Sequence, residues 1–412
     1  MELLEKIAAG GWPLWIIPLV SALVGWWTNA VAVKMLFQPT EFVGIRPFLG
    51  WQGIVPASAI ILARKSTDLI MGRLLTVREL FAGFDGAKMA KDLGPALDRW
   101  TDDILQEAIG QYAADTWERM AEPARAAIRQ MLRSEIERTA ADILEDLHTD
   151  VEKVFDLRKV VLDQATKDRK LISDIFETVG SKEFSFIRLS GLYFGLPFGI
   201  LQMMQWASLP IWWSLPVAGF FVGYGTNWLA MKLIFYPRNP IKLGPVTLHG
   251  LFHKRQREVA LEYSHAISQK LMSPESIVQT ITSGEHGEAL FSIVQRHVGA
   301  LIDKYEKNPM AAMLFPADKR EQMRQEIFER MQAELPKPGG FLHQFTERAM
   351  DIQGELYRRM ERLDATAFEG VLRPAFQQDE WKLIVVGGVL GFGAGFTQLV
   401  LFFSDVWHSV QF

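Results

Sequence analysis

Residues Gly25–Pro39 read GWWTNAVAVKMLFQP, and residues Gly223–Pro237 read GYGTNWLAMKLIFYP. The two stretches align without a gap at an offset of 198 residues, and seven of the 15 aligned positions are identical. An internal repeat decides the architecture of a chain, so it has to be traced before single elements are assigned.

The match continues on both sides of this pair. Downstream, Gly53-Ile54-Val55 matches Gly250-Leu251-Phe252 at an offset of 197. Far downstream, a glycine series with a following glutamine recurs at an offset of 196: Gly191, Gly195, Gly199 and Gln202 match Gly387, Gly391, Gly395 and Gln398. The nearly constant offset predicts that the whole chain is a tandem duplication.

The composition combines apolar and charged segments. Of 412 residues, 49% are hydrophobic and 22% are charged, which is typical of a chain divided between membrane spans and charged helical regions. The net charge of −4 gives no general attraction to nucleic acid, so we expect no nucleic-acid partner. The chain has no cysteine, which excludes disulfides, thiolate metal sites and cysteine nucleophiles.

Four stretches have the length and apolarity of a bilayer span, about 20 residues. They run from about 12–37, 186–206, 209–236 and 381–403. Helices of a soluble core, or a cleaved signal peptide ending near Ala30-Val31-Ala32, are the alternatives. The recurrence of the first pattern inside the chain argues against a signal peptide. Tryptophans near the ends of the stretches favour membrane interfaces: Trp12, Trp15, Trp206, Trp212, Trp213, Trp381 and Trp407.

We therefore predict an all-α integral membrane protein with four transmembrane helices. Repeat 1 covers 1–207, with a helical lobe at about 40–185, and repeat 2 covers 208–412, with a lobe at about 238–380. Two spans per repeat make the repeats parallel, so both lobes lie on one side of the membrane. Apolar residues three or four apart, as in 128–147, predict helical lobes, and no alternating strand pattern is visible.

The basic residues flanking the spans cluster at the lobe ends, and the positive-inside rule then favours cytoplasmic lobes. Lys34 and Lys232 lie five residues after Asn29 and Asn227, where a lysine can reach lipid phosphates. Interfacial lipid or partner contact is predicted for five cations: Lys34, Lys232, Lys254, Arg255 and Arg257.

Small and polar residues recur every three or four positions within the spans. Such stripes allow close packing and hydrogen bonding between membrane helices, or they line a polar path for a substrate together with Gln202 and Gln398. The predicted seam comprises Ser21, Gly25, Thr28, Asn29, Gly191, Gly195, Gly199, Gly219, Gly223, Thr226, Asn227, Gly387, Gly391 and Gly395.

Signatures of catalysis and cofactor binding are missing from the sequence. It contains no zinc-protease, nucleophile-elbow, phosphate-loop or dinucleotide motif. His249 and His253 are four apart and could share a metal, but no third ligand is evident. We expect no catalytic residues, cofactor or metal.

The second copy of the repeated stretch, from Gly223 to Pro237, resembles the bacterial membrane family catalogued as domain of unknown function 445, with its YheB-like and YjiN-like members. The first copy departs from the family pattern at Ala30, which replaces a tryptophan. His253 stands where the following family element has proline. The resemblance implies a multi-pass protein of a bacterial inner membrane, and it implies no established activity.

These features favour a non-enzymatic membrane scaffold whose lobes bind a protein partner or a second copy of the chain, alongside membrane lipids. A transporter that moves a lipid or another amphiphile along the lobes is the alternative, and a lipid-acting enzyme is a third possibility.

Overall fold

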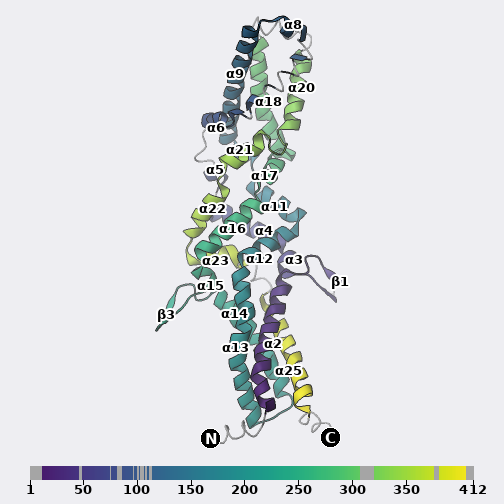
Figure 1. Ribbon diagram of the computed structural model, residues 1–412, viewed down its shortest axis with the longest axis vertical. Coiled ribbons are helices and arrows are strands. Elements are labelled where there is room, and N and C mark those ends of the chain that lie inside the picture. Colours follow the sequence, from purple (N-terminus) through teal and green to yellow (C-terminus); the bar gives the residue numbers. More distant parts are fainter. Residues whose placement is uncertain are drawn as a thin grey trace. The chain divides into compact units, whose positions relative to one another are not determined.

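The computed structural model describes residues 12–45, 49–74, 76–80, 86–95, 97–99, 102, 106, 109–110, 114–306, 320–374 and 380–404, and its regular structure is mostly helical (Figure 1). The chain divides into two compact units. We call residues 1–69, 165–266 and 357–412 the bundle unit, and residues 70–164 and 267–356 the lobe unit. Each unit contains segments of both predicted repeats. The predicted boundary between the repeats, after residue 207, therefore stays a prediction.

Four long helices form the core of the bundle unit: α2 (Trp12–Phe37), α13 (Ser181–Ser208), α14 (Ser214–Phe235) and α25 (Glu380–Phe402). Among the described residues, α2, α13 and α25 are long and apolar enough to cross a membrane, and α14 falls outside this group. The third span was predicted to begin at Leu209, but α14 begins five residues later. Leu209 precedes Pro210, which favours the extended backbone that Leu209 adopts (φ −150°, ψ 88°).

The four helices form two tightly packed pairs, α2 with α13 and α14 with α25. Glycine permits this close packing. A Cβ atom added to Gly25 would lie within 3.0 Å of the carbonyl oxygen of Gly191, and one added to Gly223 would collide in the same way with Gly387. Gly195 faces Ser21, and Gly219 faces Gly391. Backbones can approach this closely only where side chains are absent, as in membrane helix pairs.

Large apolar side chains cover the outside of all four helices. One example from each helix is Leu19 (60% exposed), Leu201 (62%), Phe221 (63%) and Val389 (60%). In contrast, Asn29, Asn227 and Thr226 are at most 2% exposed. A soluble helix bundle has a polar outer face, whereas the outer face of this bundle is apolar and these polar side chains lie inside.

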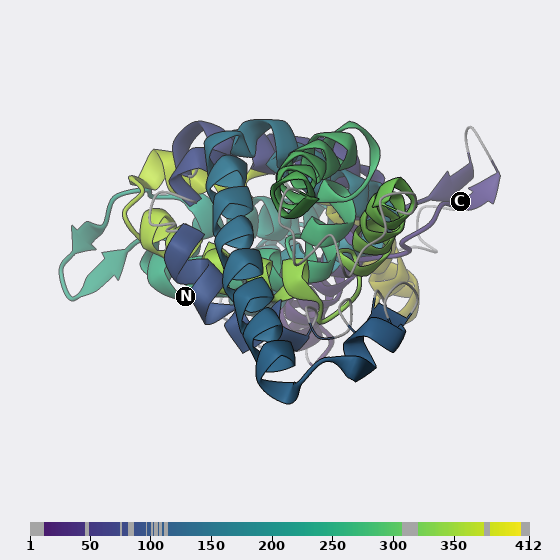
Figure 2. The same ribbon diagram turned by 90° about the horizontal axis from the view of Figure 1, so that it is seen from above.

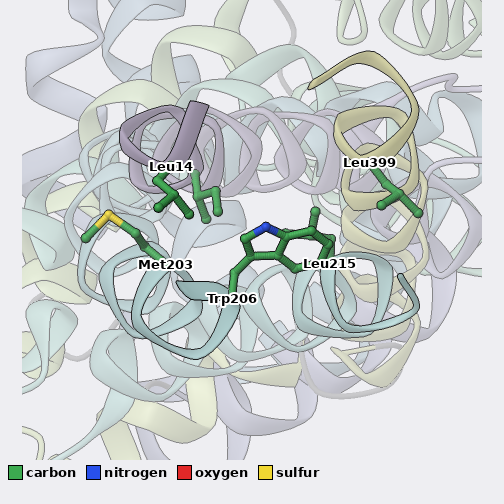
Figure 3. Close-up of a cluster of buried hydrophobic side chains, with 6 residues drawn as sticks. Leu14, Met203, Trp206, Leu215 and Leu399 are labelled. Carbon is green, nitrogen blue, oxygen red and sulfur yellow. The ribbon is translucent and has the colours of Figure 1, made fainter. Parts of the chain in front are cut away.

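All four helices also meet in one apolar cluster (Figure 3). Trp206 lies at its centre and is 4% exposed. The prediction that Trp206 belongs to an interfacial belt was therefore wrong, whereas Trp15 and Trp381 are 59% and 61% exposed. The cluster consists of Leu14, Ile17, Met203, Trp206, Leu215 and Leu399.

Two short β-hairpins, which the sequence did not predict, follow α2 and α14 in an otherwise helical fold. Strands β1 (Val43–Ile45) and β2 (Leu49–Trp51) pair with each other, as do β3 (Ile241–Leu243) and β4 (Val246–Leu248). Strands of three residues are too short to produce a recognisable alternation of apolar and polar residues. The turn after β3 contains Gly244 with φ +61°, a conformation that favours glycine.

Each hairpin leads into a pair of short helices. Helices α3 (Ile54–Ala57) and α4 (Ala59–Leu69) follow the first hairpin, and α15 (Leu251–Lys254) and α16 (Gln256–Lys270) follow the second. Gly53 and Gly250 cap α3 and α15 with nearly the same backbone angles, φ −52°, ψ 141° and φ −54°, ψ 136°. Helix α12 (Arg169–Val179) packs on α3 and α4, and α23 (Ala365–Leu372) packs on α15 and α4.

The lobe unit is built around α9 (Glu122–Thr149) and α18 (Gly284–Glu306), which lie side by side (Figure 1). Lys304 lies 2.8 Å from Glu135, whereas Arg296 lies 2.6 Å from Asp146, so the two helices run antiparallel. The helix predicted within 128–147 is confirmed by α9, and Pro123 stands in its first turn, where a missing backbone N–H is tolerated.

The remaining helices of the lobe unit are shorter: η1 (Ile70–Leu74), α5 (Val77–Leu80), α6 (Gly86–Asp92), α8 (Ala114–Arg119), α10 (Val151–Val154), α17 (Pro274–Ile281), α20 (Arg320–Glu334) and α21 (Phe341–Ala349). Helices α11 (Leu157–Lys167) and α22 (Ile352–Glu361) each contribute residues to both units.

The glycine contacts predict opposite outcomes for two neighbouring substitutions in α14. Gly223→Ala should destabilise the bundle by about 1–3 kcal/mol, because the new methyl group collides with the backbone at Gly387. Gly225→Ala is the matched control, since its Cβ would be 3.9 Å from the ring of Phe198. It should be neutral or stabilising, because alanine is the better helix former. Thermal unfolding of both variants in mild detergent measures the difference, and equal midpoints would contradict the packing.

Candidate functional site

The polar seam between the bundle helices is held by two buried asparagines. Asn29 Nδ2 donates a hydrogen bond to the carbonyl oxygen of Ile187 (2.6 Å) on α13. Asn227 Nδ2 donates to the carbonyl oxygen of Leu383 (3.0 Å) on α25. The two bonds occupy corresponding places in the two helix pairs, and each links the helices of its own pair.

Thr226 joins the two pairs across the centre of the bundle. Its hydroxyl lies 3.4 Å from Asn29 Oδ1 and 3.3 Å from the carbonyl oxygen of Gly223. Thr28, the corresponding residue of the first pair, hydrogen-bonds within its own helix to the carbonyl oxygen of Gly25 (3.1 Å). A second bond between the pairs runs from Gln202 Nε2 on α13 to the carbonyl oxygen of Leu215 on α14 (3.5 Å). The seam is thus cross-linked between the pairs, and it is not symmetric.

The glutamines of the predicted polar path differ in their partners. Ser21 Oγ donates to Gln202 Oε1 (2.9 Å), whereas Gln398 Nε2 is buried without a hydrogen-bond partner. Gly219 occupies the position that corresponds to Ser21, so the second pair lacks the hydroxyl group. The side chains of Asn29, Asn227 and Gln202 are thus engaged within the protein, as helix packing requires.

The five cations predicted to contact lipid or a partner fall into two groups. Lys34, Lys232 and Lys254 are exposed, and Lys232 Nζ lies 5.3 Å from the ring centroid of Tyr236. Arg257 is 83% exposed and pairs with Glu361 at 2.9 Å. Arg255, in contrast, is engaged in an ion pair that is largely buried.

Arg255 links α13 to the helices after the second hairpin. Its Nη1 lies 2.5 Å from Oε1 of Glu183, which is 1% exposed, and its Nε lies 2.7 Å from Glu258. A buried carboxylate needs such a partner because leaving a charge unpaired away from water is costly. The guanidinium group of Arg255 therefore holds the bundle to its neighbouring helices.

A second buried carboxylate, Glu369 on α23, organises a cluster that the sequence did not predict. Arg238 Nε lies 2.5 Å from Glu369 Oε2, and Arg373 pairs with the other carboxylate oxygen. Arg373 Nη1 also donates to the hydroxyl group of Tyr236 (2.9 Å). The guanidinium groups of Arg238 and Arg373 lie 5.4 and 5.5 Å from the Tyr236 ring centroid. We call these four residues the Glu369 cluster.

The electrostatics of the cluster keep Glu369 ionised. Burial alone raises the pKa of Glu369, but the hydrogen bonds from Arg238 and Arg373 outweigh burial, and the net pKa is lowered from 4.5. The stabilisation is therefore fully present above pH 4.5 and is lost as the pH falls through the lower pKa of the folded state.

The two histidines of the second hairpin region lie beside this cluster. The rings of His249 and His253 stack with centroids 5.9 Å apart, and His249 Nε2 lies 3.1 Å from the carbonyl oxygen of Arg238. Burial lowers the pKa of His253, which is 6% exposed. Within the described part of the chain, no group of three potential ligands surrounds a metal position.

At the described positions of the first half that correspond to Tyr236, Arg238 and Glu369, the residues carry no charge and no aromatic ring. Gln38 and Thr40 correspond in sequence to Tyr236 and Arg238, and Ser173 corresponds to Glu369 at the offset of 196. The Ser173 hydroxyl group is buried without a hydrogen-bond partner. The charged cluster is therefore a feature of the second half.

Removing the carboxylate tests the cluster. Glu369→Gln should destabilise the protein by about 1–3 kcal/mol at neutral pH, because the neutral amide loses the charge-assisted hydrogen bonds from Arg238 and Arg373, whose side chains are 40% and 24% exposed. Glu361→Gln removes the partner of the exposed Arg257 and should cost at most about 1 kcal/mol. Unfolding in mild detergent at pH 7 compares the two variants. Equal losses of stability would show that Glu369 is not a structural counter-ion.

Comparison with known proteins places the chain among bacterial membrane proteins. A UPF0754 membrane protein from Microcystis aeruginosa is 31% identical over 179 residues, 40% of this chain and 41% of the relative. One from Nostoc is 29% identical over 178 residues, 40% of each chain, and one from Synechococcus elongatus is 42% identical over 69 residues, 15% of this chain and 16% of the relative. The chain thus matches less than half the length of these relatives.

No family profile matches the chain, and no solved structure matches it. The names of the relatives assign them to a membrane and give no activity. Together with the three long apolar helices, the similarity supports a helical membrane protein of a bacterial, uncharacterised family.

Proposed function

We propose that this protein is a four-span membrane scaffold, built as a tandem duplication, whose helical lobes bind a protein partner at the cytoplasmic face of a bacterial inner membrane. The observation that carries the proposal is the apolar exterior of the bundle. Its polar side chains are buried between helices, and its large apolar side chains face outward, as a lipid environment requires.

The fourth span in this proposal is α14. Asn227 and Lys232 make it more polar than its neighbours, but Asn227 is buried against Leu383 and Lys232 stands near the helix end, where its amine can reach the interface. Phe221 and Trp228, 63% and 45% exposed, give α14 the same apolar exterior as the other helices.

The duplication is supported by matched contacts as well as by sequence. The backbone N–H of Gly53 donates to the carbonyl oxygen of Pro39 (2.9 Å), and that of Gly250 donates to the carbonyl oxygen of Pro237 (2.9 Å). Together with the two asparagine bonds of the seam, these contacts recur at the sequence offsets of the repeat. The resemblance to domain of unknown function 445 and the similarity to UPF0754 proteins both favour a bacterial membrane family of this kind.

The scaffold role is supported by the surface of the lobe unit. Helix α9 spans about 42 Å, and only four of its 28 residues are buried: Ile128, Ala140, Leu144 and Leu147. Helix α8 has no buried residue among those described. Such long, charged and largely uncovered helices offer a partner a wide polar surface. A cavity between α9, α10 and α21 has a volume of about 30 Å³ and an almost wholly apolar lining, and it is too small for an amphiphile.

The membrane topology can be tested with single cysteines, because the chain contains none. Glu137→Cys and Glu347→Cys place one thiol on an exposed position of each predicted lobe, and Leu209→Cys places one between α13 and α14. In intact cells, a membrane-impermeant maleimide should label Leu209→Cys alone. In inverted vesicles it should label the other two. Labelling of Glu137→Cys and Glu347→Cys from opposite sides would contradict the parallel duplication.

The scaffold role predicts partner capture that depends on the charge of α9. Arg138 and Asp142 are exposed and one turn apart, so Arg138→Glu with Asp142→Lys inverts the local charge and preserves the net charge. This double variant should lose a captured partner about tenfold or more, the equivalent of about 1.4 kcal/mol. Its thermal midpoint should match that of the control, Arg138→Lys with Asp142→Glu. Capture of this chain alone, in mild detergent and at native expression, would contradict the scaffold.

A further inference from the structure

The two hairpins expose apolar side chains beside the ends of the bundle helices. Val43 and Ile45 in the first hairpin are 64% and 75% exposed, and Ile241 and Leu248 in the second are 50% and 39% exposed. Figures 1 and 2 show the hairpins projecting to opposite sides of the bundle, next to the ends of α2 and α14. Apolar side chains held this far out of a core mark a surface for another molecule.

The hairpins have fixed positions relative to the helices that precede them. Each is closed at its base by the backbone bond from Gly53 to Pro39 or from Gly250 to Pro237. A side chain adds a second contact at the same place in each half: Gln52 Nε2 donates to the carbonyl oxygen of Thr40 (2.8 Å), and His249 lies against that of Arg238. The strands therefore begin within a few residues of the end of a bundle helix and are held there.

The second hairpin has an amphipathic pattern. Ile241 and Leu248 are cross-strand partners, and Lys242 pairs with Thr247 at the next position. Paired residues share one face of a hairpin, and successive residues alternate between faces. One face therefore carries the Ile241–Leu248 pair, and the other carries the exposed Lys242 and Thr247.

The headgroup layer of a membrane can accommodate both the apolar face and the polar face of this hairpin. An isolated two-stranded hairpin is marginally stable in water and needs a surface for its apolar face. Its unpaired backbone groups cannot enter hydrocarbon, but headgroups and their water can bond to them. Exposed cations on and beside the second hairpin, Lys232, Lys242 and Lys254, complement the phosphates of anionic lipids.

We infer that both hairpins lie flat in the headgroup layer of the membrane that the bundle crosses, with Ile241 and Leu248, and Val43 and Ile45, facing the acyl chains. This inference rests on the proposed membrane bundle. The hairpins bind the membrane interface on opposite sides of the bundle, and they thereby fix the depth and tilt of the bundle in the lipid.

Depth-dependent fluorescence quenching tests the inference on the full chain. Ile241→Cys and Val43→Cys receive an environment-sensitive fluorophore, and the proteins are reconstituted in vesicles of phosphatidylethanolamine and phosphatidylglycerol. Spin-labelled lipids with the quencher near the headgroup should quench both labels more strongly than lipids with the quencher near the acyl terminus. The labels should lie about 5–10 Å into the boundary between headgroups and acyl chains.

Three control positions separate this inference from the proposed function. A label at Val389 on the outer face of α25 should be quenched best by the deep lipid quencher, and a label at Glu137 on α9 by neither lipid quencher. A label at Lys242, on the other face of the hairpin, should lie shallower than one at Ile241.

Three quenching results would contradict these expectations, and each shows which statement is wrong. If Val389 is in lipid and Ile241 is quenched by aqueous iodide as strongly as Glu137, the membrane bundle stands and the hairpin inference is overturned. If neither water nor lipid quenchers reach Ile241, a protein covers the hairpin, and the inference is again overturned. If Val389 itself is in water, the membrane bundle is wrong and the hairpin inference falls with it.

Discussion

The close approach of helix backbones around two buried asparagines is the constraint on which the bundle depends. Lipid provides no hydrophobic force that brings helices together, so contact and hydrogen bonds must do so. Asn227 can reach the carbonyl oxygen of Leu383 only because Gly387 leaves room, since a Cβ there would lie within 3.0 Å of the asparagine side chain. The glycine stripe and the asparagine bond therefore require each other. Large side chains are excluded from the seam and remain on the outside, where lipid accepts them.

The two halves share the contacts that hold the helix pairs and the hairpins in place, and they differ in other side chains. The asparagine bonds, the capping glycines and the base of each hairpin recur in both halves. At the hairpin base, the side-chain contact is made by Gln52 in the first half and by His249 in the second. Ser173 stands at the first-half position that corresponds to the buried carboxylate Glu369, so the two halves differ in the charged cluster.

Residues that follow a helical period could be predicted from the sequence, and residues that depend on long-range partners could not. Gly25, Asn29 and their counterparts lie four apart on one face of a span, and the structure brings each of them to a helix contact. Arg255 looked like an interfacial cation because its neighbours Lys254 and Arg257 are basic. Its buried partner Glu183 lies 72 residues earlier in the chain, at the polar start of α13, and no local pattern connects them.

For the same reason, the sequence did not predict the cluster around Glu369, and it predicted the wrong environment for Trp206. An isolated glutamate in a short amphipathic helix gives no sign that Arg238, 131 residues earlier, will face it. A tryptophan near the end of a span has the composition of an interfacial residue, but the meeting of four helices at Trp206 buries it (Figure 3). Periodicity thus predicts which face of one helix is packed, whereas the depth of a side chain depends on how many other helices meet there.

The polar groups of the seam also bear on the choice between a scaffold and a conduit. A path for a polar substrate needs side chains whose hydrogen-bonding groups are free to exchange partners. Asn29, Asn227 and Gln202 hold partners in neighbouring helices, and breaking those bonds would loosen the contacts that keep each helix pair together. Gln398 differs, because its Nε2 is buried without a partner. In the sequence, Gly219 stands at the position that corresponds to Ser21, the partner of Gln202 in the first pair. One such amide is a local defect in a packed interface, and this arrangement favours a bundle that anchors its lobes over one that opens to pass a substrate.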